Sequence, residues 1–436
     1  MISQELFFNL FYIILWIGVI LLFIYFYYFL IVATLPRFPS TQHIHKQYTN
    51  ENLVFICMIP CLNEEKVIVN TVHSLLNIEA PNVYIVVIDD GSDDHTAEVV
   101  KNIEDSKVKL LQRKSPYARQ GKGEALNWAY QKICKATKRM NLSPDQVIVC
   151  IMDGDGRPSA NMFQEAYKAF LHPRIGAAQV RVKISNNNRF LTFMQDLEFY
   201  TIIGFIQNSR QYFQSVCLGG NGQFCRLRAL QDLGHKPWTK CLVEDFDLGI
   251  RLLINNWETR FLTNTFVVQQ GLYEPKRFIR QRARWAQGNM QCLIYLRNIW
   301  NANIPSLAKI DLIYYLLQPW ISLLSSCVII IGFLLLGNIF LDFTITSTSN
   351  KAKLLFYISI AFLPGLTWGL FHYKNIRQSF FRCFLCGLLF PLYILFTNIS
   401  TWCAFYRYIL NRDNWEKTER VDEKIFKASL QQKQNV

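Results

Sequence analysis

The chain has 436 residues, of which 46 are Lys or Arg and 32 are Asp or Glu, so its formal net charge is +14. Because 51% of the residues are hydrophobic and 18% are charged, a disordered chain is excluded, and 12 cysteines over this length are too few for a disulfide-stapled secreted module. A mean hydropathy of +0.11 predicts membrane-embedded and soluble parts in one chain.

The first long apolar run, residues 6–32, carries no charge. It is long enough to cross a bilayer, which takes about 20 residues. Since the charge before it is Glu5 and not the basic start of a signal peptide, we predict a transmembrane helix at 1–34. Arg37 and Lys46 follow the run, so the N-terminus is expected outside and the next segment in the cytoplasm.

A soluble region follows, in which short apolar strands alternate with helical segments. We expect strands at 53–59, 83–88, 108–111 and 147–152, with helices at 65–76, from His95 onward and at 123–138. Such alternation predicts a parallel sheet covered by helices on both faces. In such sheets ligands bind beyond the carboxyl ends of the strands. The cysteines of this region are expected to stay reduced in the cytoplasm.

Polar segments follow three of these strands, at 60–65, 89–94 and 153–156. One such segment is typical of a turn or a helix cap. Three at one rim of a sheet repel each other unless a cation or the donors of a ligand balance their charge. Asp153 and Asp155 offer hard oxygens, which Mg²⁺ or Mn²⁺ prefers when a diphosphate supplies further ligands.

The second half of the chain contains several apolar segments. The segment 190–213 is too polar to span a bilayer and predicts an amphipathic helix at the membrane surface. Stretches at 316–340, 354–372 and 380–399 are apolar enough to span, with a basic cytoplasmic loop (Lys374, Arg377, Arg382) before the last and an outer linker at 344–350. Pro391 leaves two arrangements open, because the last stretch either crosses fully or re-enters and keeps the tail cytoplasmic.

Seven short motifs occur in an order that resembles the membrane-integrated, inverting glycosyltransferases of family 2. They are Ile-Pro-Cys-Leu-Asn-Glu (59–64), Val-Ile-Asp-Asp-Gly-Ser (87–92), Gly-Lys-Gly-Glu-Ala-Leu-Asn (121–127), Asp-Gly-Asp (153–155), Gly-Gly-Asn-Gly (219–222), Glu-Asp (244–245) and Gln-Arg-Ala-Arg-Trp (281–285). The processive branch of this family contains the cellulose, hyaluronan and poly-N-acetylglucosamine synthases. The resemblance implies an α/β, Rossmann-like GT-A domain in the cytoplasm, with α-helical transmembrane segments at both ends.

These observations divide the chain into five expected parts. They are a transmembrane helix at 1–34, a GT-A domain at 35–275, interface helices with the Gln-x-x-Arg-Trp element at 276–312, a transmembrane region at 313–406 and a charged tail at 407–436. Within the tail, the segment 415–420 resembles an element of bacterial exopolysaccharide synthases, which favours a cytoplasmic tail. The expected location is the plasma membrane, in multi-pass form.

The resemblance also implies roles in donor binding. The expected donor-binding residues are Pro60, Asn63, Glu64, Asp90, Lys122, Asp153, Gln281 and Arg284. Carboxylates and amides accept hydrogen bonds from a uracil N–H or ribose hydroxyls, which suits Asn63, Glu64 and Asp90 to the nucleoside. A helix cap remains the alternative for Asn63 and Glu64, and a solvated surface lysine remains the alternative for Lys122.

A second group of residues is expected at the reacting bond. The resemblance implies that Asp153 and Asp155 hold the metal and that Asp245, beside Glu244, takes the proton of the acceptor hydroxyl. The pattern of apolar residues after Asp245 places it at the start of a helix, so an N-cap is the alternative. Asp247 is a further acid that is easily confused with the base.

The acceptor is expected to contact Gly220, Asn221 and Trp285. A glycine-rich backbone lets a sugar approach closely, although a hairpin turn explains 219–222 almost as well. Trp285 presents an apolar ring face for stacking on a sugar, while Arg284 is placed to clamp the diphosphate. The basic run around them, 276–284, also predicts a helix lying on anionic lipid.

The combined expectation is a metal-dependent enzyme that transfers a sugar from a nucleotide-sugar donor, expected to be UDP-linked, to a growing β-linked polysaccharide and exports the product. A glycolipid synthase resembling ceramide glucosyltransferases is the first alternative, and an inactive membrane scaffold is the second. Intact Asp153, Asp155, Asp245 and Arg284 argue against the scaffold. The positive charge is assigned to membrane-facing loops and not to nucleic acid, and an accessory membrane subunit is an open partner.

Overall fold

The computed structural model describes residues 4–38, 53–78, 80, 82–342, 348–376 and 378–412. Several positions used above lie outside these residues. They are Lys46, Arg377, most of the linker at 344–350 and the tail element at 415–420.

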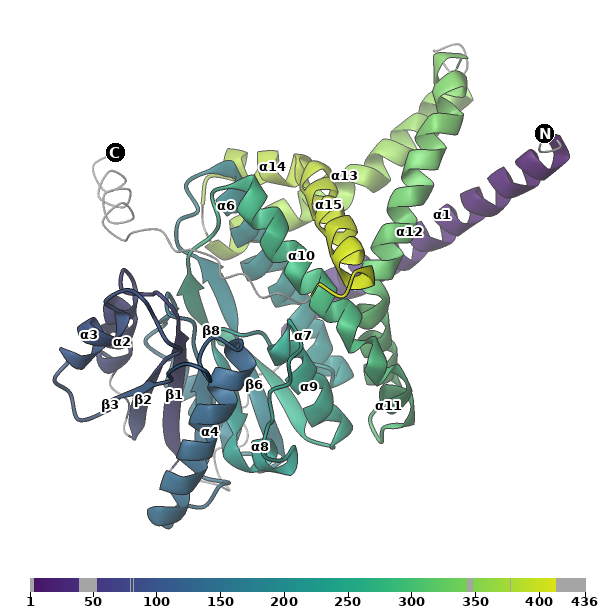
Figure 1. The fold of residues 1–436 in the computed structure, drawn as a ribbon. Coiled ribbons are helices and arrows are strands. Elements are labelled where there is room, and N and C mark those ends of the chain that lie inside the picture. Colours follow the sequence, from purple (N-terminus) through teal and green to yellow (C-terminus); the bar gives the residue numbers. More distant parts are fainter. Residues whose placement is uncertain are drawn as a thin grey trace.

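The centre of the α/β domain is an eight-stranded mixed sheet with the order β3-β2-β1-β4-β7-β6-β8-β5 (Figure 1). Its strands are β1 (Val54–Cys61), β2 (Val83–Asp89), β3 (Val108–Gln112), β4 (Val147–Ile151), β5 (Arg157–Pro158), β6 (Ile175–Ile184), β7 (Gln223–Arg226) and β8 (Glu258–Gln269). The four predicted strands are β1 to β4, and each pairs with its neighbour in parallel, as expected.

The expectation of a parallel sheet is wrong for β7 and β5, whereas β6 pairs with β8 in parallel. Strand β7 runs antiparallel to both β4 and β6, and β5 runs antiparallel to β8. The reason is that the segment before β7 arrives at the carboxyl end of β4, so that β7 starts there and runs in the opposite direction. The carboxyl end of β4 therefore meets the loop at 219–222.

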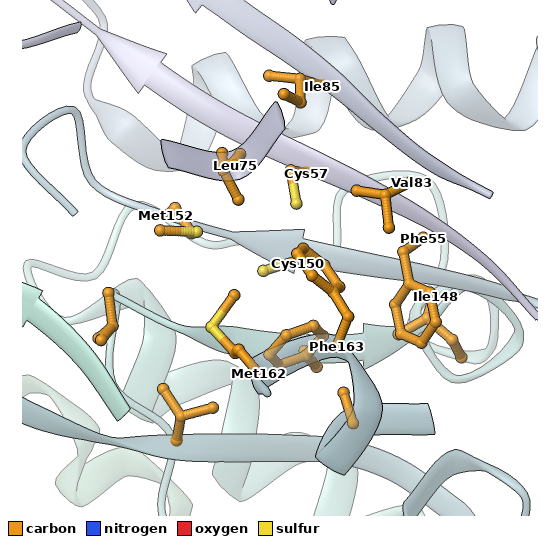
Figure 2. Close-up of a cluster of buried hydrophobic side chains, with 14 of the residues drawn as sticks. Phe55, Cys57, Leu75, Val83, Ile85, Ile148, Cys150, Met152, Met162 and Phe163 are labelled. Atoms are coloured by element: carbon orange, nitrogen blue, oxygen red, sulfur yellow. The ribbon is translucent and has the colours of Figure 1, made fainter. Parts of the chain in front are cut away.

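Helices cover both faces of the sheet. One face packs against α2 (Ile68–Leu76), α3 (Thr96–Lys101) and α5 (Met162–Phe170), and the other against α4 (Lys122–Arg139), α8 (Leu227–Asp232) and α9 (Glu244–Ile254). Strand β1 shows the division, because Cys57 and Ile59 contact the first cluster and Met58 the second. Figure 2 shows side chains of the first cluster, with Phe163 of α5 beside Phe55 of β1. Burial on both faces explains why these strands are continuously apolar.

The predicted helix at 190–213 is present as a continuous helical segment. It comprises α6 (Phe190–Asp196), a π-helical stretch η2 (Leu197–Ile203) and α7 (Gly204–Phe213). The wider turn of η2 carries Glu198, whose carboxylate accepts two hydrogen bonds of 2.7 Å from Arg282 of α10 (Pro275–Gln291). The hydroxyl of Tyr393 donates to the same carboxylate at 2.5 Å.

Each predicted apolar stretch is helical. These helices are α1 (Gln4–Thr34), α12 (Ser306–Asp342), α13 (Thr348–Ile376), α14 (Phe380–Leu388) and α15 (Phe390–Ile409), with η3 (Cys292–Tyr295) and α11 (Leu296–Asn301) between α10 and α12. In Figure 1, α1 and α12 extend away from the sheet.

Within the described residues, one helical segment, Trp16–Thr34, is long and apolar enough to cross a membrane. A second is found if α14 and α15 count as one span, although they meet at an angle of 52°. The break falls at Leu389, with Pro391 in the first turn of α15, where proline is tolerated because the first N–H groups of a helix have no partner. Transmembrane segments at both ends, and the path of the last stretch, therefore stay predictions.

A buried ion pair attaches α12 to the α/β domain. The Arg210 Nε of α7 lies 2.9 Å from the Asp311 Oδ2 of α12, and the two side chains are 4% and 3% exposed. Ser215 donates to the same oxygen at 2.7 Å, and the Arg210 guanidinium lies 4.2 Å from the centre of the Tyr315 ring. The charges thus have partners on several sides.

We predict that Arg210→Met or Asp311→Asn lowers the free energy of unfolding by about 3–5 kcal/mol, because each leaves the other charge buried without its partner. Thermal unfolding of the purified protein in detergent measures this change. The control is Arg228→Ala, which breaks an exposed pair with Asp232 of 3.5 Å and should cost less than about 1 kcal/mol. Equal effects at the buried and exposed pairs would contradict the prediction.

Candidate active site

The polar segments after β1, β2 and β4 lie together, as the sequence predicts. The Asn63 Oδ1 accepts a hydrogen bond of 2.9 Å from the N–H of Asp93, and the Asn63 N–H donates to Ser92 at 2.9 Å. Thr71 of α2 donates to the C=O of Gly154 at 2.7 Å. Hydrogen bonds therefore connect the segment after β1 to the segment after β2, and helix α2 to the segment after β4.

Asn63 and Glu64 do not cap α2. Its N-cap is Val67, and among the described residues no side chain accepts a hydrogen bond there. The Glu64 side chain is buried instead against Gly154, where an added Cβ would lie 3.1 Å from Glu64 Cγ. Pro60 lies beside them in β1, opposite Ile88 of β2. The structure thus places the expected nucleoside residues against the Asp153 segment.

Asp90 forms a buried ion pair with Arg113, whose Nη1 lies 2.6 Å from Asp90 Oδ1. Burial raises the pKa of Asp90, and the Arg113 charge partly opposes that rise. The sequence analysis missed Arg113, which directly follows β3. Ligands in such sheets bind beyond the carboxyl ends of the strands, so the residue after β3 was a candidate as well. The sequence analysis considered only the segments after β1, β2 and β4.

Lys122 is a central cation of the site and not a solvated surface lysine. Its Nζ lies 2.8 Å from Asp153 Oδ1 and 3.7 Å from Glu244 Oε1, and its side chain is 19% exposed. Burial by itself would lower the pKa of Lys122, but the carboxylates of Asp153, Glu244 and Asp245 outweigh this effect and raise it. The ammonium group therefore stays charged and joins the β4 segment to the start of α9.

The loop at 219–222 lies directly beside this cation. The C=O of Gly220 is 3.4 Å from Lys122 Nζ, and a Cβ added to Gly220 would lie 2.9 Å from that Nζ and 3.1 Å from Asp245 Oδ2. The loop connects α7 to β7 and is no hairpin turn. A side chain at Gly220 would therefore enter the space between Lys122 and Asp245.

Two amides hold this loop in place. The buried Gln179 of β6 accepts from the N–H of Gly219 and donates to the C=O of Asn221, both at 2.8 Å. The Asn221 side chain accepts from the N–H of Asp153 at 3.2 Å and donates to Gln269 at 2.9 Å. The sequence analysis missed Gln179, although a polar residue directly after the apolar start of β6 was a usable signal.

Asp153 and Asp155 offer carboxylate oxygens at the carboxyl end of β4. Asp155 is buried and accepts a hydrogen bond of 3.0 Å from the N–H of Gln270 after β8, whereas Asp153 is half-buried and faces Lys122. Across the part of the chain that the structure describes, no group of three or more His, Cys, Asp or Glu side chains could hold a metal ion. The donor set fits a hard divalent cation that completes its coordination with oxygens of a ligand.

The acids at the start of α9 have different surroundings. Helix α9 begins at Glu244, as predicted, and within the described residues no side chain caps it, so the N-cap alternative is not observed for Asp245. The Asp247 carboxylate is 1% exposed and binds Arg251 at 3.1 Å and Tyr295 at 2.9 Å. Asp247 is thus a structural residue, which separates it from Asp245.

Asp245 has a strongly raised pKa. Its Oδ1 accepts a hydrogen bond of 2.8 Å from the N–H of Phe246, and its Oδ2 is the oxygen that faces Gly220. Burial raises the pKa of Asp245 to about 7, the Glu244 carboxylate adds to the rise, and Lys122 and Arg284 oppose it. A carboxylate with this pKa can accept and release a proton near neutral pH.

The Gln-x-x-Arg-Trp element lies on α10, with Gln281 one turn before Arg284. Arg284 points to the segment before α9, where its Nη1 donates to the C=O of Leu242 at 3.2 Å. Trp285 instead packs edge-on against Phe199 of η2, with ring centres 5.9 Å apart, and the Arg282 guanidinium lies 4.6 Å from its ring centre. The element therefore connects α9 to the π-helical stretch.

Comparison with known proteins identifies the family of this chain and several of its relatives. The sequence model of the family described as "Glycosyltransferase like family 2" matches residues 53–288. A β-monoglucosyldiacylglycerol synthase of Trichormus variabilis is 30% identical over 260 residues, which cover 58% of this chain and 53% of the relative. A poly-β-1,6-N-acetyl-D-glucosamine synthase of Staphylococcus epidermidis is 28% identical over 283 residues, which cover 63% of each chain. This chain thus spans about half the length of the first relative.

Among solved structures, a mannosyltransferase from Pyrobaculum calidifontis in complex with GDP-Man and Mn²⁺ has a TM-score of 0.56 and 17% sequence identity. The similarity covers 91% of this chain and 99% of that one. It confirms the GT-A fold.

We predict that turnover increases with pH through the range around 7. Asp245 is protonated below its raised pKa and ionised above it, so a step that needs the carboxylate should speed up about tenfold between pH 6 and pH 8. Steady-state rates with saturating donor measure the profile. Glu244→Gln should move the midpoint to lower pH, since the Glu244 charge helps to raise the pKa of Asp245. A flat profile between pH 5.5 and pH 8.5 would contradict the prediction that turnover needs the ionised Asp245 carboxylate.

Proposed function

Since the chain belongs to glycosyltransferase family 2, we propose that it moves a sugar from a UDP-linked donor, with inversion, onto a growing β-linked polysaccharide. The coarser statement, that it is a nucleotide-sugar glycosyltransferase, follows from the family and its relatives. The observation that carries the proposed transfer is the position of Gly220 next to both Lys122 and Asp245, and the relative from Staphylococcus epidermidis, named as a poly-β-1,6-N-acetyl-D-glucosamine synthase, favours a polysaccharide as the product.

Asp245 acts as the base in this proposal. Its carboxylate takes the proton of the acceptor hydroxyl, whose oxygen attacks the anomeric carbon of the donor sugar. The new bond forms on the face opposite the diphosphate while the bond from that carbon to the diphosphate oxygen breaks, so the configuration inverts. Because Gly220 has no side chain, its backbone lies directly beside Asp245 Oδ2, and in this proposal the acceptor hydroxyl approaches the carboxylate along that backbone.

Positive groups balance the charge of the leaving diphosphate. Lys122 stays charged next to Asp153, and Arg284 lies close enough to Asp245 to lower its pKa. Fixed cations at the place where negative charge develops stabilise the transition state. Asp153 and Asp155 would hold a divalent cation, Mg²⁺ or Mn²⁺, which supplies further positive charge at the diphosphate when it is bound.

The nucleoside would be held by the segments after β1 and β2. Asp90 is oriented by Arg113, and Asn63 is held by the backbone of the β2 segment, so both oxygen-bearing side chains are fixed before the donor arrives. Pre-orientation of this kind lowers the entropy lost on binding. In the same proposal Gln281 contacts the donor, and Asn221 supports the acceptor loop through its bonds to Asp153 and Gln269.

We place the catalytic domain on the cytoplasmic side of a multi-pass plasma-membrane protein. The apolar segment Trp16–Thr34 and the helices α12 to α15 support this arrangement. The buried pair of Arg210 and Asp311 would hold the base of α12 against the domain, next to Tyr315. Anionic lipid would bind the basic residues of α10, and an accessory membrane subunit is compatible with this layout.

A glycolipid synthase is the second candidate function. The relative from Trichormus variabilis, named as a β-monoglucosyldiacylglycerol synthase, favours it. In that reading Asp245 and Lys122 keep their roles, and the acceptor hydroxyl belongs to a membrane lipid. The two candidates differ in the size of the product and not in the chemistry at Asp245.

We predict that Asp245→Asn reduces transfer by about 10²–10⁴-fold while nucleotide affinity stays within a few-fold of wild type, because the amide cannot accept the proton. Turnover assays and nucleotide titration measure the two quantities. Asp247→Asn is the control. Because that carboxylate is structural, its loss should lower the unfolding temperature and change the intrinsic rate only slightly. Loss of nucleotide binding in Asp245→Asn would make Asp245 structural.

The product distinguishes the two candidate functions. The purified protein in lipid vesicles, incubated with radiolabelled UDP-sugars, should form a water-soluble polymer of many sugars under the polysaccharide proposal. Size-exclusion chromatography and organic extraction measure this result. A labelled product that partitions entirely into the organic phase, with one sugar per lipid, would overturn the polysaccharide proposal and support the glycolipid synthase.

A further inference from the structure

The segment that precedes the base lies against the C-terminal half of α10. Leu242, three residues before Asp245, donates its N–H to Gln291 Oε1 at 3.0 Å, and its C=O accepts from Arg284 Nη1 at 3.2 Å. Both backbone groups of this residue are therefore bound by side chains of one helix. Neither contact belongs to the sheet that carries the other polar segments of the site.

Gly288 lets the same segment approach the backbone of α10. A Cβ added to Gly288 would lie 2.7 Å from Val243 Cγ2 and 2.8 Å from the Val243 backbone nitrogen, distances too short for any side chain. The Cys241 Sγ lies 3.5 Å from the C=O of Gly288 and 3.7 Å from the Cys292 Sγ. All three residues of the segment Cys241–Val243 thus contact α10.

The first turn of α9 is held from the other side by α12. Phe246, next to Asp245, packs edge-on against Tyr315 with ring centres 4.9 Å apart, and it shares a buried cluster with Leu312 and Leu316. Asp245 therefore lies in the first turn of the short helix α9. Two helices that come later in the chain, α10 and α12, fix the position of that turn. A shift of either helix would move the carboxylate relative to Gly220 and Lys122.

We propose that Gln291 and Gly288 are positioning residues that set the Asp245 carboxylate against Gly220. This inference rests on the proposed role of Asp245 as the base. Gln291 accepts from Leu242 and Gly288 packs against Val243, so their effect on the reaction passes through the segment Cys241–Val243. A misplacement of about 1 Å at a reacting group can cost about 10²-fold in rate.

The first test is Gln291→Leu, which removes the acceptor for the Leu242 N–H. We expect kcat to fall at least about tenfold while the donor KM changes less than about twofold, since the nucleoside-binding segments after β1 and β2 are untouched. The pH midpoint should move down by about half a unit, because a looser segment lets water reach Asp245. The matched control is Gln131→Leu on α4, where an exposed amide donates to the C=O of His235 at 3.5 Å, and its kcat should stay at the wild-type value.

Gln291→Glu is the conservative variant. It keeps an oxygen acceptor for Leu242 and should restore most of the kcat lost in Gln291→Leu, while its negative charge moves the pH midpoint up and not down. Gly288→Ala should lower kcat further by displacing Val243, and Val243→Ala in the same chain should recover part of the loss. If Gly288→Ala fails to fold, the comparison of Gln291→Leu with Gln291→Glu still tests the inference.

Wild-type kcat and pH midpoint in folded Gln291→Leu would overturn the inference. So would an equal loss of kcat and nucleotide affinity, because that result shows a general disturbance of the fold. Asp245→Asn separates this failure from failure of the proposed function. If Asp245→Asn still transfers sugar, the proposed base is wrong, whereas an inactive Asp245→Asn beside a fully active Gln291→Leu overturns the positioning role alone.

Discussion

The ammonium group of Lys122 is the interaction on which the site depends. It is 2.8 Å from Asp153 and 3.7 Å from Glu244, two carboxylates that lie far apart in the sequence. Two like charges about 4 Å apart repel by about 4 kcal/mol at the effective dielectric constant near a protein surface. A cation between them offsets that repulsion. It allows Asp153 after β4 and Glu244 of α9 to lie close together, beside the backbone of Gly220.

The surroundings of each acid decide what it can do. Asp245 and Asp247 are two residues apart on the same short helix, yet their carboxylates have opposite fates. Arg251, Thr239 and Tyr295 occupy Asp247, which thereby connects α9 to its neighbouring segments. Asp245 is half-buried beside Glu244 and has an oxygen facing Gly220, and its pKa rises to about 7. Chemical identity alone does not distinguish them, but burial and partners do.

The helices that follow the GT-A domain also build its active site. Helix α10 holds the segment before Asp245, and α12 packs against Phe246 and is attached by the buried pair of Arg210 and Asp311. The π-helical stretch η2 adds a third contact through Glu198 and Arg282. Interfaces of this kind transmit displacement because packed side chains resist compression. The geometry at Asp245 is therefore coupled to helices that the sequence predicts to lie at or in the membrane.

The sequence by itself determined the local structure. Continuous apolar runs predicted β1 to β4, helical spacing placed Asp245 in the first turn of α9, and the motifs identified Lys122 and Asp153, because such signals arise from neighbouring residues. Only the tertiary structure decided the antiparallel course of β7, the support of the 219–222 loop by Gln179 and the pairing of Arg113 with Asp90. These features join residues 23 to 78 positions apart. The pairing of such distant residues depends on three-dimensional packing, and the periodicity of a local segment contains no information about it.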